Sequence, residues 1–183
     1  MTLDPLVSTA HATPFGEVNV LVTPEDGVVR AAGFRPLRDV AFGLRADLST
    51  RGWVAGEAPE IDDAVVRWLG GDADAIATVP VDQPGGPFFQ EVWAALRSVP
   101  GGQVVSYGEL AQMAGRPRAM RAVGTACARN GIAPFVPCHR VIQSGGRLGS
   151  YGFGGMAVKA AMLEHEGLSV PLPHPDARVT AAR

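Results

Sequence analysis

The sequence predicts an α/β (α+β) fold, in which a small sheet-plus-helix domain precedes a mostly helical, winged-helix-like domain built on a helix-turn-helix. Three observations lead to this prediction. Valines alternate with polar residues in 14–34, which indicates paired strands. Apolar residues recur at helical spacing in 60–69 and again in 88–97. Two short helical patterns joined by a tight turn within 106–130 indicate a helix-turn-helix.

The chain has 183 residues, of which 46% are hydrophobic, so it can bury one large core or two small ones. A stretch rich in Pro and Gly, 83–87, is the predicted linker between an N-terminal supporting domain, 1–82, and a C-terminal domain, 88–167. The last segment, 168–183, has three prolines and no apolar period, which predicts a loose tail.

Charge is distributed unevenly between the two halves of the chain. Residues 1–85 contain 6 Lys and Arg against 13 Asp and Glu, whereas residues 86–183 contain 10 against 5. The second half is therefore basic although the whole chain has a net charge of −2. This split indicates that the second half meets a polyanion. Two domains that merely complement each other would give the same split.

The sequence disfavours membrane, secreted and metal-binding proteins. No apolar run reaches the roughly 18 residues of a membrane span, and residues 1–13 lack the pattern of a signal peptide. The two cysteines, Cys127 and Cys138, make neither a disulfide framework nor a zinc-ligand pair. We therefore expect a cytoplasmic protein with no membrane partner, no metal and no cofactor.

The elements of the first half follow from its apolar pattern. Two strands within 14–34 are separated by the turn-forming residues 24–27. Residues 36–48 have the spacing of an amphipathic helix, and so do residues 60–69, which a Gly-Gly pair ends. None of these segments carries a catalytic signature, so we expect the first half to support the second.

The second half begins with three predicted helices. The first, 88–97, places aromatic and aliphatic residues on one face, which favours core packing over a surface for stacking bases. Ser106, followed three residues later by a glutamate, has the pattern of a capping box at the start of the second helix. Pro117 suits the first position of the third helix.

The third predicted helix, 117–129, carries one long cation among small side chains, and Asn130-Gly131 can close it in the left-handed conformation. The cation is Arg121, and its small neighbours include Ala119, Ala122 and Gly124. Such a helix can press its backbone into a groove while the arginine projects. Tight helix–helix packing, with Arg121 reaching solvent, is an equally good interpretation.

The hexapeptide 136–141, Val-Pro-Cys-His-Arg-Val, places a thiol beside two side chains that can carry positive charge. A thiol reacts as its thiolate, and cationic neighbours lower its pKa. His139 and Arg140 could supply such a field, which makes Cys138 a candidate nucleophile. The alternative is a structural cysteine buried in a turn, because free cysteines are often buried.

A Gly-rich loop, 143–155, follows the cysteine and contains Tyr151 and Phe153, which can wall a pocket for a planar ligand. The loop lacks the spacing of a nucleotide P-loop. A last predicted helix, 156–167, completes the domain. Together with the basic helix, these features fit a nucleophilic cysteine that acts on a DNA base, which has to be flipped out of the duplex to be reached.

Residues 87–167 resemble the O6-alkylguanine-DNA alkyltransferases, also called methylated-DNA–protein-cysteine methyltransferases. The matching motifs are 105–111, 121–124, 137–142 and 149–152, with Phe89, Gln90, Trp93, Leu96, Asn130, Leu163 and Glu166. The most specific of these is the Pro-Cys-His-Arg-Val run together with the upstream Arg-Ala-Val-Gly. Residues 1–82 resemble the family's N-terminal domain only in layout.

The resemblance implies DNA repair by an irreversible, stoichiometric transfer of an alkyl group to an internal cysteine. Cys138 matches the acceptor cysteine. His139, acting through a water, and Glu166 match the residues that help to generate its thiolate. Tyr107 matches the phenol that protonates the departing guanine, and Asn130 matches the residue that turns the chain between the DNA-reading helix and the reactive site.

The resemblance also implies a partner and its binding surface. The partner is double-stranded DNA containing O6-alkylguanine, bound through the minor groove by a protein expected to be a monomer, with cooperative assembly on DNA left open. Arg121 matches the finger that fills the gap left by the flipped nucleotide. The other expected DNA contacts are Ala119, Ala122, Gly124 and Tyr107. The expected pocket residues are Tyr151, Ser150, Gly152, Val141 and Cys127.

Three other functions fit parts of the pattern. An alkyltransferase-like protein binds the lesion without repairing it, but such proteins lack a cysteine at the position of Cys138. A Cys–His hydrolase needs a residue that orients His139, and the sequence offers no Asp or Asn for this task. A plain helix-turn-helix protein would leave the cysteine structural.

This chain also departs from the family pattern. Gly131 stands where many members have proline, which would loosen the turn after Asn130. Phe153 changes the loop that walls the pocket. Cys127 is either a second reactive thiol or, the reading we favour, a small pocket or core residue. The first 82 residues contain no cysteine, so no zinc cluster can form there.

Overall fold

The valine-rich segment of the first half forms the centre of a four-stranded sheet in the computed structural model, which describes residues 3–171 and 173–182. The strand order is β3-β2-β1-β4. The three long strands pair antiparallel, and β4 joins the edge parallel to β1. The strands are β1 (Leu6–Thr13), β2 (Gly16–Val22), β3 (Val29–Gly33) and β4 (Trp53–Ala55).

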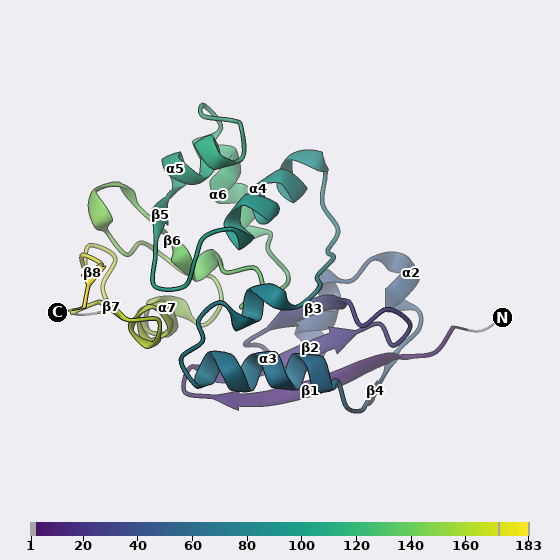
Figure 1. Ribbon diagram of the computed structural model, residues 1–183. Coiled ribbons are helices and arrows are strands. Elements are labelled where there is room, and N and C mark those ends of the chain that lie inside the picture. The colour runs from purple at the N-terminus through teal and green to yellow at the C-terminus, as the bar shows by residue number, and fades with distance from the viewer. Residues whose placement is uncertain (1–2, 172, 183) are drawn as a thin grey trace.

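Alternation along β2 decides which side chains face which helices. Val18, Val20 and Val22 point into a cluster with Ile61, Val65 and Trp68 of α3 (Pro59–Leu69), which lies along one face of the sheet (Figure 1). Leu21 points to the opposite face, where it packs with residues of α1 (Leu37–Val40) and α2 (Ala46–Ser49). The period-2 pattern thus gives the sheet a helical layer on each side.

Two expectations for the first half need correction. The helix expected over 36–48 is broken into α1, a 3-10 turn η1 (Ala41–Gly43) and α2, because Leu44 and Arg45 have extended backbones after a helix-breaking glycine. Strand β1 was not expected, because Ser, Thr, His and Ala fill most of its positions. Its pairing with β2 supplies the order that its own sequence does not indicate.

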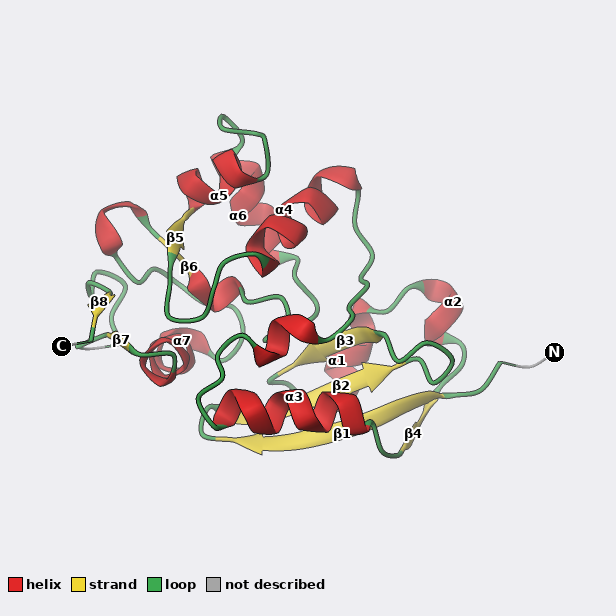
Figure 2. Ribbon diagram, viewed as in Figure 1, coloured by secondary structure: helices red, strands yellow, loops and turns green. Residues whose placement is uncertain are grey.

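Helices dominate the second half (Figure 2). They are α4 (Pro87–Arg97), α5 (Tyr107–Met113), α6 (Met120–Ala128) and α7 (Gly155–His165). Two short parallel strands, β5 (Val105–Ser106) and β6 (Val141–Ile142), join the helix pair α5–α6 to the cysteine segment. Besides η1, the described residues form the 3-10 turns η2 (Ala75–Thr78) in the first half and η3 (Cys138–Arg140) and η4 (Ser144–Gly146) in the second.

Local signals set the boundaries of α5 and the start of α6. The sequence analysis predicted the start of α5 correctly and the start of α6 at the wrong residue. Ser106 caps α5 in a complete capping box with Glu109, as predicted. The helix ends at Gly115 (φ +70°), and the N–H of Arg116 bonds back to the Ala111 carbonyl, as in a Schellman motif. Pro117 therefore lies in the inter-helix turn, and α6 begins only at Met120.

The closure of α6 also differs from the prediction. No residue other than glycine has a positive φ in the described chain, and Gly131 is not among the glycines that do. Instead, the N–H of Arg129 bonds back into the last turn of the helix. The turn after α6 is held by hydrogen bonds to other segments, because the Gly131 carbonyl accepts from the Ala32 N–H of β3 at 2.9 Å.

The two halves share one hydrophobic cluster across the linker. It contains Trp68 of α3 and Val20 of β2 together with Trp93 of α4 and Val123 of α6. His165, at the end of α7, donates a hydrogen bond from Nε2 to the Trp68 carbonyl at 2.9 Å and packs edge-on against the Phe15 ring. The linker thus joins two segments of one continuous core.

Within 168–171 and 173–182, part of the segment after α7 packs against the domain. Strand β7 (Leu168–Ser169) pairs antiparallel with β8 (Thr180–Ala181), and Val179 is buried in a small second cluster with Leu148. The prediction of a loose tail over 168–183 rested on its prolines, which hide the few apolar residues that this segment buries. Within 3–171 and 173–182, no helix is both long and apolar enough to cross a membrane.

Candidate active site around Cys138

Cys138 begins the 3-10 turn η3, directly after Pro137 and before strand β6. Its side chain is only 6% exposed. The amide nitrogen of Asn130, two residues past the end of α6, donates a hydrogen bond to its sulfur at 3.2 Å. The same nitrogen donates to the Val136 carbonyl at 2.8 Å, so Asn130 holds both the thiol and the chain leading to it.

A cavity of about 420 Å³ opens onto this cysteine. Its size lies in the range of small-molecule sites. The walls come from α5, α6, the Gly-rich loop and the segment after β3. The lining residues are Arg35, Tyr107, Gly124, Cys127, Ala128, Asn130, Cys138, Ser150, Tyr151, Gly152 and Phe153. The structure thus brings together seven of the residues that the sequence assigns to catalysis or to the pocket, from separate segments between Tyr107 and Gly152.

Burial raises the pKa of the Cys138 thiol, and three neighbours act against that rise. These are the amide of Asn130, the positive charge of Lys159 and the hydroxyl of Tyr151. Lys159 is the only lysine of the chain, and its buried Nζ donates to the carbonyls of Val141 (2.6 Å) and Leu148 (2.7 Å). Burial lowers the pKa of Lys159 to about 8. The thiolate, once formed, therefore has donors and a cation around it.

A fully buried chain of three ionisable groups stands behind the cysteine. His139 Nε2 lies 2.9 Å from Glu166 Oε1, and Arg140 donates from Nε to Oε2 and from Nη2 to Oε1, both at 2.9 Å. Burial lowers the pKa of His139, although Glu166 acts to raise it. Burial acts to raise the pKa of Glu166, but His139 and Arg140 outweigh it and bring it to about 2.

The imidazole of His139 has distinct partners at its two nitrogens. Nε2 faces the Glu166 carboxylate, whereas Nδ1 is buried and has no protein hydrogen-bond partner within the described residues. A carboxylate that accepts from Nε2–H leaves the lone pair of Nδ1 free to take a proton. The residue that orients His139, which the sequence did not identify from spacing, is therefore Glu166 at the end of α7.

Tyr107 is the first residue of α5 and lines the cavity opposite the cysteine segment. Burial and the nearby Cys127 and Cys138 raise its pKa to about 12, so the phenol stays protonated at neutral pH. The capping box at Ser106 fixes the start of α5 and with it the direction of the tyrosine. The ring lies beside Gly124 of α6, where a Cβ would be at an ordinary contact distance of 3.9 Å from Tyr107 Cε1.

The predicted DNA-reading helix, α6, is exposed on the face that carries Arg121, Ala122 and the adjoining Met120. A second hollow of about 400 Å³ runs along this face from Arg121 to Arg147. Tyr107 and Gly124 line both hollows, so the exposed face of α6 is continuous with the cysteine cavity. Ala119 caps α6 and lines neither of these hollows.

The structure also places some residues differently from the sequence-based assignment. Val141, expected in the pocket wall, is fully buried in β6 and does not line the cavity; its carbonyl holds Lys159 instead. Arg35 lines the cavity from the first half, which the sequence analysis did not suspect. No sequence signal marks Arg35, because only the tertiary fold carries the end of β3 to this wall.

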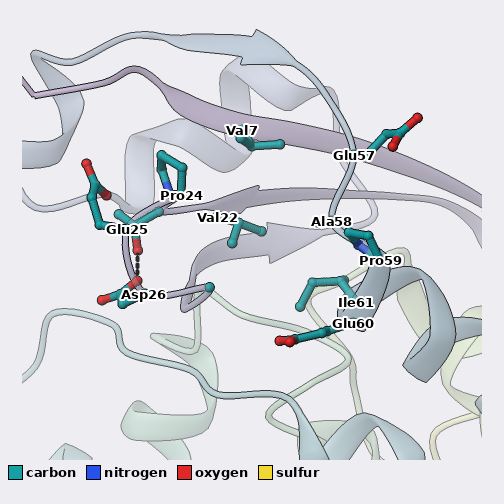
Figure 3. Close-up of a pocket in the computed structure, with 12 residues that line it drawn as sticks. Val7, Val22, Pro24, Glu25, Asp26, Glu57, Ala58, Pro59, Glu60 and Ile61 are labelled. Atoms are coloured by element: carbon teal, nitrogen blue, oxygen red, sulfur yellow. Dashed lines mark hydrogen bonds between the residues drawn. The ribbon is translucent and has the colours of Figure 1, made fainter.

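A larger cavity, of about 500 Å³, lies in the first half between the turn after β2 and the start of α3 (Figure 3). It contains no cysteine, and four carboxylates line it. In Figure 3 the side chains of Glu25 and Glu57 lie at opposite ends of the cavity, so they do not converge on one point. Across the described residues no group of His, Cys, Asp and Glu side chains could hold a metal ion. The chemistry thus concentrates at Cys138.

Comparisons with known proteins show the family of the chain. A sequence model described as "6-O-methylguanine DNA methyltransferase, DNA binding domain" matches residues 87–168. A methylated-DNA–protein-cysteine methyltransferase of Shigella flexneri is 45% identical over 107 residues, which are 58% of this chain and 62% of that protein. A protein of the same name from Cricetulus griseus is 46% identical over 94 residues, 51% of this chain and 45% of that protein. The chain thus spans less than two thirds of the length of these relatives.

Solved structures extend the likeness to the first half. The O6-methylguanine methyltransferase of Mycobacterium tuberculosis superposes with a TM-score of 0.66 and 32% identity, over 88% of this chain and 92% of that one. A structure of the same organism's protein in complex with DNA gives a TM-score of 0.68 at 31% identity, over 87% and 92%. On these similarities, the chain belongs to the methylated-DNA–protein-cysteine methyltransferases, the O6-alkylguanine-DNA alkyltransferase family.

Proposed function

We propose that this protein repairs DNA by direct reversal, taking the alkyl group of O6-alkylguanine onto Cys138. One observation carries the proposal. The sulfur of Cys138 faces a cavity of about 420 Å³, with hydrogen-bond donors at its rim and the buried His139–Glu166–Arg140 chain behind it. A thiol in such surroundings is equipped to react as a thiolate with a planar ligand held in the cavity.

The first step is removal of the thiol proton. A water between Cys138 and the Nδ1 atom of His139 would carry the proton to the imidazole. This supports the proposed role of Glu166, because its carboxylate accepts from Nε2 and stabilises the imidazolium that forms. Asn130 and Lys159 stabilise the sulfur anion from the other side.

The second step is a direct displacement. The thiolate attacks the alkyl carbon, the S–C bond forms, and the bond between that carbon and O6 breaks. The bonding electrons leave with guanine, which takes a proton from the phenol of Tyr107. A thioether is stable and the described residues offer no group that would reverse its formation, so each molecule acts once.

Access to the base requires that DNA and the cavity meet at α6. We propose that α6 lies in the minor groove, that the alkylated nucleotide is flipped into the cavity, and that Arg121 fills the gap in the stack. The shared lining of the two hollows by Tyr107 and Gly124 supports this path. In this arrangement residues 88–167 bind DNA and residues 1–82 support them.

The test is the intact mass of the protein after incubation with a duplex that carries one O6-methylguanine, followed by peptide mapping. We expect a gain of one methyl group on the peptide that contains Cys138 and restoration of guanine in the DNA. Cys138→Ala should gain no methyl group but still bind the duplex, and Cys127→Ala, the matched thiol control, should be methylated normally.

Two results would contradict the proposal. A methyl group on Cys127 would move the acceptor to α6. Tight binding to the lesion without any adduct would leave a protein that recognises alkylguanine and does not repair it.

A further inference from the structure

Gln83, in the linker between the halves, reaches the turn that precedes the cysteine segment. Its side chain is only 5% exposed. Its Oε1 accepts from the N–H of Gly131 at 2.6 Å, and its Nε2 donates to Oδ1 of Asn130 at 3.1 Å. A linker residue thus bonds directly to the side chain that touches the reactive sulfur.

The hydrogen bonds of Asn130 fix which end of its amide faces Cys138. Oδ1 accepts from Gln83 and from the N–H of Ile132 at 3.0 Å. Nδ2 donates to the Val136 carbonyl at 2.8 Å and to the Cys138 sulfur at 3.2 Å. Backbone N–H groups can only donate and carbonyls can only accept, so these partners set the polarity of both amides.

The backbone on either side of Gln83 is also held. The N–H of Asp82 donates to the Val29 carbonyl of β3 at 3.0 Å, and Gln90 of α4 donates to the Gln83 carbonyl at 2.7 Å. The amide of Gln83 therefore projects from an anchored point. Gly131 completes the arrangement, because a proline at this position would have no N–H to orient Oε1.

We propose that Gln83 is a positioning residue for alkyl transfer: through Asn130 it keeps an amide N–H, and not a carbonyl oxygen, directed at the sulfur of Cys138. The proposal rests on the proposed function. An N–H donated to sulfur stabilises the thiolate, whereas a rotated Asn130 would place its oxygen against the developing negative charge. Gln83 opposes that rotation because its donor needs an acceptor from Asn130.

The sharpest test is Gln83→Glu. The carboxylate can still accept the hydrogen bond from the N–H of Gly131. Toward Asn130 it presents a second oxygen in place of the N–H that donates to Oδ1, so this hydrogen bond is lost. We expect single-turnover methyl transfer at neutral pH to slow by roughly five- to tenfold, the worth of one net hydrogen bond, with unchanged affinity for duplex DNA. Gln83→Met, of similar length, removes both bonds and should slow transfer at least as much.

Gln90→Met is the matched control. It removes the hydrogen bond that α4 makes to the Gln83 backbone, but it leaves the side-chain amides of Gln83 and Asn130 in contact. We expect its transfer rate to stay within about twofold of the wild-type rate, well below the loss of one net hydrogen bond. Equal slowing in Gln83→Glu and Gln90→Met, with equal loss of thermal stability, would show a merely structural linker and overturn the proposal.

A second readout separates this proposal from the proposed function. Iodoacetamide modification of Cys138, followed by peptide mapping without DNA, reports thiolate formation against pH. The other titrating groups near the sulfur are Tyr107, Cys127, Tyr151 and Lys159, with His139 in the adjoining chain. None of these groups forms a hydrogen bond with the side chain of Gln83, and Gln83→Met adds no charge, so they titrate alike in the wild type and in this variant.

Gln83→Met, which removes both hydrogen bonds without adding a charge, should shift the Cys138 modification profile to higher pH. An unshifted profile would overturn the role of Gln83 even if methyl transfer occurs. A wild-type protein that transfers no methyl group, together with a shifted profile in the variant, would contradict the proposed function alone.

Discussion

The guanidinium of Arg140 is fully buried, and its hydrogen bonds join three distant parts of the chain. It binds both oxygens of Glu166, the Val99 carbonyl at 2.6 Å and the Ala73 carbonyl at 2.7 Å. Val99 follows α4, Glu166 follows α7, and Ala73 belongs to the first half. The buried positive charge depends on Glu166 for its compensation, since Asp74 is exposed and 3.8 Å away.

Glu166→Gln should therefore destabilise the fold as well as slow transfer. It leaves the Arg140 charge buried without a counter-charge, which typically costs about 3–5 kcal/mol. Urea unfolding at pH 7 measures the loss. Glu164→Gln, an exposed neighbour on α7, is the control and should change stability by less than about 0.5 kcal/mol. Equal stability of the two variants would contradict the assigned role of the ion pair.

The ion pair of Glu166 and Arg140 also makes the free energy of unfolding depend on pH. The folded pKa of Glu166 is lowered to about 2, so its stabilisation is complete above the ordinary value of 4.5 and is lost as the pH falls toward 2. His139 acts in the same direction. Its pKa is lowered in the folded protein, so below the ordinary value of 6.5 the unfolded chain binds a proton more readily than the folded protein, and the free energy of unfolding falls. The difference in stability between wild type and Glu166→Gln should thus shrink below about pH 4.5.

Residues of the site differ in how far the sequence could predict them. Cys138, His139 and Glu166 lie in motifs whose chemistry or family resemblance is readable from the chain, and the structure brings them together. Arg35 and Gln83 lie in a strand end and a linker with ordinary composition. Nothing local distinguishes them, because their contacts depend on how the first half docks on the second.

Among the elements, a helix boundary was predictable where the residues that set it lie close together in the sequence. The capping box of α5 is made by residues three apart, so it forms wherever that helix forms. The turn after α6 is held by Gln83, 48 residues away in sequence, and by Ala32, about a hundred residues away. These partners cannot be predicted from Asn130-Gly131 alone. The ordered C-terminal segment was missed for the same reason, since it bonds to the loop that walls the cavity: Leu148 N–H donates to the Ala177 carbonyl at 2.8 Å.

At the scale of α6, Arg121→Ala tests the proposed finger. The side chain is exposed, and the described residues form no ion pair with it. If it fills the gap in the stack, its loss should slow repair of duplex DNA by roughly ten- to thirtyfold, since flipping a base costs a few kcal/mol that the finger offsets. Reaction with free O6-methylguanine base should stay within about twofold, because no stack has to be opened.

Arg67→Ala is the matched control for charge. Arg67 lies on α3, next to Asp63 and Asp72, and does not line the cysteine cavity. It should leave both reactions unchanged. A loss in Arg121→Ala that is equal for duplex and free base would place the arginine in the chemistry of the cavity and contradict a finger.

For the molecule as a whole, the linker composition favours two separate units, but the packing joins them. An apolar helix face shows that it will be buried without showing what will cover it, so the sequence could not reveal a shared core. In the structure, the cluster that holds Trp68 also holds Trp93, and β3 bonds both to residues 80–82, directly before the linker, and to the turn before the cysteine. Any opening of this interface would disturb Gln83, Asn130 and Arg140 together.

This continuity predicts that the two halves unfold in one cooperative transition, since separating them would expose the apolar surface that both share. The chain offers a label in each half, because Trp68 and Trp93 are buried on opposite sides of the linker. In protein labelled with 5-fluorotryptophan, the native ¹⁹F resonances of these two residues should disappear at the same urea concentration. Trp53, which is partly exposed on β4, serves as the internal reference for denatured-state signals. If the Trp68 resonance disappears first while Trp93 keeps its native shift, the second half holds its fold alone, and the first half is a separable support.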